Sequence, residues 1–333
     1  MQSKNYTFEV LSKFRPQLMG VAAIGILLCH AGGNGVQLPY ALGYVFGFGN
    51  FGVDLFLLLS GFGLYNSLHR SLQTDGIGGW YRRRFTRLLV PYLILSIPYW
   101  AYICKIEGVG IKHFLYYIST LVYWFEHRGA WFVALIVPLY LISPIIYRIC
   151  VGKKGIIKLL FLTFIVGIIA IIPNNSYIWG NMAFALERTP CFFLGFITGK
   201  LAEKGVEIKY SNVILLCLCM FVCNKLFRVI NVNIFGLLAC PILWIVTIIA
   251  PMFFKCNILS KVLGFMGAIS LESYLTNIYL GDICRKLNYD NKLFVYTLII
   301  IIGIALSYVV NIFSNKIIRP TITTRTTISN KYE

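Results

Sequence analysis

The chain has 333 residues, of which 58% are hydrophobic and only 13% are charged, a composition far from that of an ordinary soluble domain. Its formal net charge of +18 would suggest nucleic acid in a soluble chain, but membrane proteins carry such an excess on the cytoplasmic side. We therefore predict an all-α polytopic integral membrane protein that does not bind nucleic acid.

The expected elements are apolar helices separated by clusters of charge. Ten stretches are candidates for transmembrane helices, and an even number places both termini on one side. With the N-terminus inside, most of the 30 basic residues fall in inner segments, so both termini are expected in the cytoplasm. The stretches are 18–30, 42–64, 88–104, 131–147, 156–172, 182–201, 213–227, 234–253, 262–284 and 293–313.

The first stretch ends on an ionisable side chain. It holds no charge from Leu18 to Cys29, and His30 then comes directly before Ala31-Gly32-Gly33, where a helix has reason to stop. A run of about twelve residues rises only ~18 Å, whereas the hydrocarbon core of a bilayer is ~30 Å thick. Glycine-rich backbone at that depth must be buried in protein or line a water-filled cavity. We therefore expect His30 at the floor of a polar cavity.

The second stretch carries the block GVDLFLLLSGFGL, residues 52–64, in which Asp54 is the charged residue. A carboxylate inside a span costs ~2.5 to 3.5 kcal/mol on insertion scales. Two interpretations stay open. Asp54 is a capped or paired structural residue, or it orients and charges His30, as carboxylates do for catalytic imidazoles.

Four arginines, at positions 82, 83, 84 and 87, directly precede the third stretch, at its expected cytoplasmic end; this cluster is called the arginine mouth. Arginines in such places are most often topology signals that bind lipid phosphate. Arg84 and Arg87 lie three residues apart, on one helical face, and paired guanidiniums suit a pyrophosphate. The charge run alone is compatible with both roles.

The rest of the chain adds little chemistry. We expect residues 112–125 to form a helix on the outer surface, because counting them as a span would move the basic loop 148–154 outside. The cysteines lie mostly in apolar runs without metal-ligand spacing, so no metal site is expected. Residues 1–333 are expected to form a single transmembrane domain without a soluble C-terminal domain.

The chain resembles the membrane O-acyltransferases of the acyltransferase-3 family, because six motifs occur in the order expected of that family. Each motif is weak alone, but the ordered set is specific and covers nearly the whole chain. The motifs are MGVAAIGILLCH (19–30), GVDLFLLLSGF (52–62), Arg84-x-x-Arg87 before Pro91-Tyr92, Trp131-Phe132 with Tyr140 and Pro144, RTPCFFLG (188–195) and GAISLESYL (267–275).

The resemblance implies transfer of an acyl group, usually acetyl from cytoplasmic acetyl-CoA, to a hydroxyl of an extracytoplasmic or lipid-linked glycan. It makes His30 the essential catalytic group and assigns Arg84 and Arg87 to the donor. From their own positions in the sequence, Asp54 is the expected catalytic partner of His30, and neighbouring Arg83 is expected to join the donor site. Acetyl-CoA is then the co-substrate, the glycan and membrane lipids are the partners, and the location is the cytoplasmic membrane.

Two departures from the family pattern stand out. Many members have arginine eleven residues before the histidine, where this chain has Met19; Arg15, one turn earlier on the same face, is expected to substitute for it in donor binding. Many members also end the last motif in histidine, where this chain has Asn277. No catalytic role is carried over to that position.

The expected mechanism follows from these positions. CoA is polyanionic, so its phosphates should dock at the arginine mouth while the pantetheine arm threads inward. His30, which can be neutral at pH 7, would take the proton from the hydroxyl as it attacks the thioester. A covalent acyl-histidine relay is the alternative. Outer loops, including Glu126, His127 and Trp131, are expected to contact the sugar, although His127 equally suits a solvated loop.

Two other classes compete with this one. A transporter or flippase for the same glycans would use His30 and Asp54 as a proton relay, but no inverted repeat supports it. A structural membrane subunit would explain the hydropathy, but it gives no reason for the ordered motifs.

Overall fold

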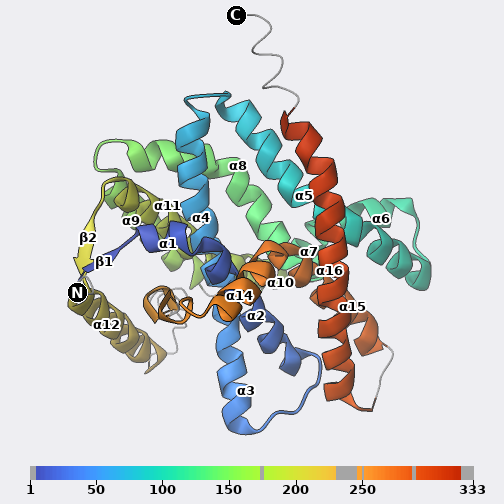
Figure 1. Ribbon diagram of the computed structural model, residues 1–333. Coiled ribbons are helices and arrows are strands. Elements are labelled where there is room, and N and C mark those ends of the chain that lie inside the picture. The colour runs from blue at the N-terminus through green and yellow to red at the C-terminus, as the bar shows by residue number, and fades with distance from the viewer. Residues whose placement is uncertain (1–4, 173–175, 230–245, 250, 287–289, 324–333) are drawn as a thin grey trace, which may run out of the picture. The chain divides into compact units, whose positions relative to one another are not determined.

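The computed structural model describes residues 5–172, 176–229, 246–249, 251–286 and 290–323 (Figure 1). These residues are overwhelmingly helical, which confirms the all-α class. They also contain a small sheet that the sequence did not suggest. Strands β1 (Asn5–Thr7) and β2 (Glu207–Lys209) pair antiparallel, with Tyr6 opposite Ile208.

Among the described residues, five helical segments are long and apolar enough to cross a membrane. A sixth is present if two helices that meet at 67°, α14 (Asn257–Ala268) and α15 (Ser270–Lys286), count as one span. The expected number of about ten is not confirmed, and most of the stretch 234–253 lies outside the described residues. The five segments are Arg15–Gly33, Tyr40–Ser71, Gly76–Glu107, Trp131–Val151 and Lys292–Ile318.

Two of the expected stretches are broken in the structure. Residues 182–201 divide at Glu187 and Arg188 into α10 (Tyr177–Leu186) and α11 (Thr189–Glu203). Pro190 lies in the first turn of α11, where its missing N–H costs no helical hydrogen bond. Residues 262–284 divide at Ile269, between α14 and α15.

The chain forms two compact units, and the first comprises residues 1–29, 44–70 and 135–268. Its helices α4 (Phe51–Ser71) and α11 approach closely at glycine residues. A Cβ on Gly61 would lie 2.1 Å from the carbonyl oxygen of Phe192, and one on Gly195 would lie 2.3 Å from that of Leu58. Small residues allow such approach between membrane helices. The helices with most or all of their residues in this unit are α1 (Glu9–Lys13), α2 (Arg15–Gly33), α4 (Phe51–Ser71), α8 (Trp131–Val151), α9 (Gly155–Ala170), α10, α11, α12 (Tyr210–Val229) and α14.

The second unit comprises residues 30–43, 71–134 and 269–333. It contains α5 (Gly76–Glu107), α6 (Ile111–Ile118), α7 (Leu121–Glu126), α15 and α16 (Lys292–Thr323), whereas α3 (Tyr40–Gly47) has residues in both units. Figure 1 shows α15 beside α16. Buried polar side chains join these two helices.

The polar contacts between α15 and α16 follow one face of each helix. Glu272 accepts a hydrogen bond from the Asn311 amide at 3.0 Å, and the hydroxyls of Thr276 and Ser307 lie 3.0 Å apart. The two α15 side chains, Glu272 and Thr276, are both buried. Polar side chains that bond across helices hold membrane helices together, so the motif around residues 270–277 builds this pair.

The predicted helix at 112–125 is present as two short helices, α6 and α7. They are separated at Ser119 and Thr120, where Thr120 adopts a left-handed backbone with φ of 69°. The position of these helices on an outer surface stays a prediction.

Candidate functional site

The helix that carries His30 ends at Gly33, within the predicted stop at Ala31-Gly32-Gly33, but it is longer than the expected stretch 18–30 since it begins at Arg15. Helix α2 has 19 residues and continues through Gly33. It ends because Gly35 takes a left-handed backbone, φ of 82°. The N–H of Gly35 then donates to Gly32 O at 2.9 Å and that of Val36 donates to Ala31 O at 3.1 Å, a Schellman end. At ~1.5 Å per residue, this helix is nearly long enough to cross a bilayer.

The imidazole of His30 is held by an amide. Its Nδ1 lies 2.6 Å from Oδ1 of Asn277, and Nδ2 of Asn277 donates to the hydroxyl of Tyr296 at 3.2 Å. With Nδ2 engaged as a donor, Oδ1 accepts from the ring, so Nδ1 carries the proton. The arrangement leaves Nε2 as the unprotonated nitrogen, which is the form that a general base needs.

Asn277 and Tyr296 are therefore site residues that the sequence did not assign. Asn277 is on α15 and Tyr296 is on α16, and both side chains are buried. The sequence did contain a signal for Asn277. Many family members have histidine at this position, and an asparagine there can also form a hydrogen bond with an imidazole.

Asp54 pairs with Arg188 in the structure, whereas His30 was the partner considered from the sequence. Its Oδ2 accepts from Nη1 of Arg188 at 2.7 Å, and the two side chains are 0% and 2% exposed. Arg188 also donates to Oδ1 of Asn50 at 3.0 Å. The pair ties the first turn of α4 to the start of α11, which is the structural role that the sequence left open. Asp54 belongs to the first unit and His30 to the second, so a direct action of Asp54 on His30 stays a prediction.

The predicted donor arginines differ in their surroundings. Arg83 pairs with Asp75, just before α5, and donates to Ser71 Oγ at 2.8 Å. Its guanidinium lowers the pKa of the Asp75 carboxyl, so the pair remains charged at neutral pH. One turn apart on α5, Arg84 is partly buried and Arg87 is exposed. Arg83 is thus engaged within the chain, while Arg87 faces solvent.

Arg15, the expected substitute for the missing arginine, begins α2. Its Nε donates to the carbonyl of Leu59 at 3.4 Å. A Cβ on Gly63 would lie 2.9 Å from its Nη2, so the guanidinium lies directly against that turn of α4. A donor contact by Arg15 stays a prediction.

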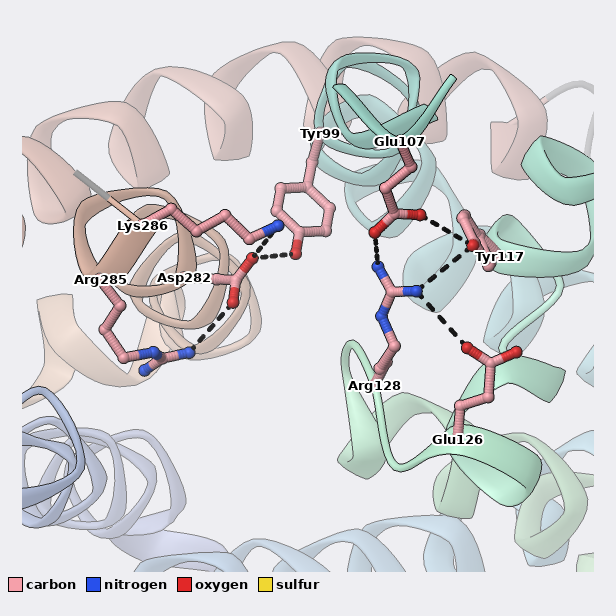
Figure 2. Close-up of polar contacts among 8 residues, drawn as sticks. All are labelled: Tyr99, Glu107, Tyr117, Glu126, Arg128, Asp282, Arg285 and Lys286. Atoms are coloured by element: carbon pink, nitrogen blue, oxygen red, sulfur yellow. Dashed lines mark hydrogen bonds and ion pairs between the residues drawn. The ribbon is translucent and has the colours of Figure 1, made fainter. Parts of the chain in front are cut away.

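The loop expected to contact sugar is fixed by ion pairs (Figure 2). Arg128 bonds Glu107 at the end of α5, the Tyr117 hydroxyl at 3.3 Å and Glu126 at 3.4 Å. Glu126 is thus already paired. His127 takes a left-handed backbone with φ of 54° at the end of α7.

A second group of charges in Figure 2 surrounds Asp282 on α15. Its carboxylate accepts from the Tyr99 hydroxyl at 2.8 Å and pairs with Arg285 at 3.4 Å and Lys286 at 3.5 Å. In the part of the chain that the structure describes, no three His, Cys, Asp or Glu side chains gather as a metal ion would need.

Long apolar helices and an imidazole that Asn277 holds through Nδ1 define a polytopic membrane protein with a candidate catalytic base. The family described as an acyltransferase domain, acyltransferase-3, matches residues 18–312. The chain therefore belongs to the acyltransferase-3 family and is a membrane acyltransferase. Comparison with curated proteins and with solved structures finds no match.

Proposed function

We propose that the protein is an O-acetyltransferase of the cytoplasmic membrane. It moves an acetyl group from cytoplasmic acetyl-CoA to a hydroxyl of an extracytoplasmic or lipid-linked glycan. The observation that carries the proposal is the 2.6 Å contact between His30 Nδ1 and Asn277 Oδ1 in a chain of this family, because it leaves Nε2 ready to accept a proton.

In this mechanism, Nε2 of His30 takes the proton of the acceptor hydroxyl as its oxygen attacks the thioester carbonyl. The tetrahedral intermediate then collapses, the C–S bond breaks, and the imidazolium returns the proton to the departing thiolate. Asn277 orients the ring throughout but carries no charge, so it cannot neutralise the imidazolium as a carboxylate does. In the alternative, Nε2 itself attacks the thioester and the acceptor takes the acetyl group from acyl-histidine.

The proposed topology has about ten spans with both termini in the cytoplasm. The excess of basic residues in the segments that would lie inside supports it. In that orientation, Arg84 and Arg87 are at the cytoplasmic mouth, where acetyl-CoA is available, and the end of α2 points outward.

The function is tested with purified protein in proteoliposomes that contain acetyl-CoA labelled in the acetyl group. Extracted surface glycan is added on the opposite side. We expect label to appear in the glycan as a base-labile ester. A transporter or flippase would move unlabelled glycan without any need for acetyl-CoA, and a structural subunit would do neither.

The arginine pair gives the next prediction. Replacing both Arg84 and Arg87 with lysine keeps the charge but removes the planar forks that bind phosphate through two hydrogen bonds. We expect acetyl-CoA to bind about tenfold to a hundredfold more weakly, measured by titration of the purified variant. The control is Arg82→Lys, in the same basic run. If the double variant binds acetyl-CoA with unchanged affinity, Arg84 and Arg87 do not bind the donor and serve only as topology signals.

A further prediction concerns Asn277 as a positioning residue. Asn277→Leu keeps the side chain's size but removes the acceptor for His30 Nδ1, and a misplaced ring costs about tenfold to a hundredfold in kcat. Affinity for acetyl-CoA should not change. Asn277→Asp, which retains an acceptor oxygen, should be more active than Asn277→Leu. Equal losses in both variants, or wild-type kcat in Asn277→Leu, would contradict the role.

A further inference from the structure

A small cavity lies just beyond His30, within the second unit. Its volume is about 190 Å³, below the ~300–1,000 Å³ of pockets that enclose a drug-sized ligand. Its wall is formed by the turn after α2, the end of α15 and the start of α16. A cavity of this size accommodates one small group of a larger molecule.

Two side chains in the cavity wall connect the cavity to His30 through hydrogen bonds. Asn34, in the turn that follows α2, donates from Nδ2 to the His30 backbone carbonyl at 2.8 Å. Tyr296 contacts Asn277, which holds the His30 ring. The cavity therefore adjoins the backbone of His30 through Asn34 and is linked to its ring through Tyr296 and Asn277.

The charged side chains in the wall are both cations, Arg285 and Lys292. Nη1 of Arg285 donates to Oδ1 of Asn34 at 3.2 Å, which fixes the guanidinium at the cavity. The stem of Lys292 packs against Gly35, where an added Cβ would lie 3.6 Å from its Cγ. The nearby carboxylate of Asp282 is shared between Arg285 and Lys286 (Figure 2), so one negative charge serves two cations at this end of α15.

We propose that this cavity binds an oxyanion of the acceptor, a carboxylate or phosphate carried close to the hydroxyl that receives the acetyl group. The proposal rests on the proposed function and names the chemical class of its acceptor. Arg285 bonds Asn34 through Nη1 and Asp282 through Nη2, and a guanidinium has three N–H groups beyond those two bonds. Lys292 adds a point charge, and both kinds of cation bind oxyanions in proteins.

The test uses Cys284, a partly buried thiol in the cavity wall. Full-length protein in phosphatidylcholine nanodiscs is treated with N-ethylmaleimide, and the rate of Cys284 modification is followed by mass spectrometry. Glucuronate and methyl phosphate are the anionic probes, glucose is the neutral probe, and exposed Cys256 is the internal control. We expect at least one anion to protect Cys284 at concentrations where glucose does not.

The matched variants are Lys292→Gln and Lys286→Gln. Lys292→Gln should raise the protecting concentration about tenfold to a hundredfold, the loss expected for one charged contact. Lys286→Gln, which pairs with Asp282 but does not line the cavity, should leave it unchanged. Equal protection by glucose, no protection by either anion, or equal effects of the two variants would overturn the inference.

The probes also separate the sources of the anion. Protection by glucuronate indicates an acidic sugar, and protection by methyl phosphate indicates a phosphate-bearing acceptor. Protection that phosphatidylglycerol nanodiscs provide without a probe would assign the cavity to lipid, and protection by acetyl-CoA that Lys292→Gln weakens would assign it to the donor; both contradict the proposal. Because protection needs no turnover, anion binding without acetyl transfer would refute the proposed function and leave the cavity site standing.

Discussion

His30→Ala is expected to bind acetyl-CoA with wild-type affinity and to acetylate its glycan ~10²- to 10⁴-fold more slowly, the usual cost of removing a general base. The physical reason is that Asn277 holds Nδ1, which makes Nε2 the proton acceptor, and alanine removes Nε2 without changing the arginines of α5. Donor binding is measured by titration and transfer by the labelled-ester assay.

The matched control is His113→Ala, which removes an exposed histidine on α6. It should transfer acetyl at the wild-type rate. A His30→Ala protein that acetylates glycan as fast as this control would show that the catalytic centre lies elsewhere. Loss of glycan export in place of acetyl transfer would favour the proton-relay transporter.

Asp54→Asn is expected to destabilise the protein by about 3 to 5 kcal/mol, because it leaves the Arg188 guanidinium buried without its counter-ion. The effect should appear as a lower Tm and a smaller monodisperse fraction in detergent. Replacing both partners, Asp54→Asn with Arg188→Gln, removes the unpaired charge and should restore much of the stability. Asp290→Asn, at an exposed carboxylate, is the control and should not change the Tm.

The double variant also decides between the two roles of Asp54. If the carboxylate acts only through the fold, the double variant recovers acetyl transfer together with stability. If it orients or charges His30, the double variant folds but remains slow. An Asp54→Asn single variant with wild-type Tm would show that the buried pair does not hold α4 and α11 together.

The helical class and the family were predictable from the sequence, because apolar runs and ordered motifs are properties of the sequence itself. His30, Asp54 and the arginines of α5 were found as ionisable groups in or beside apolar stretches, and the roles assigned to them stay predictions. The end of α2 was predictable to within the run Ala31-Gly32-Gly33, but the residue that terminates the helix was not, because Gly35 supplies the left-handed backbone.

Other features depend on contacts between distant segments. Arg188 is far from Asp54 in sequence, and nothing local to either residue indicates their pairing. The same holds for Asn277, whose bond to His30 joins residues 247 positions apart. The break before α11 had a local signal in Pro190, but in an apolar stretch hydropathy alone suggests one continuous span.

The polar face between α15 and α16 has a consequence for how the protein enters the membrane during synthesis. Helix α15 is far less apolar than α16 and buries Glu272, Thr276 and Asn277, side chains that disfavour insertion of a lone helix. Residues of α16 form a hydrogen bond with each of these side chains. The two helices should therefore enter the bilayer together as a hairpin, and Asn277 reaches its place beside His30 only after α16 has left the ribosome.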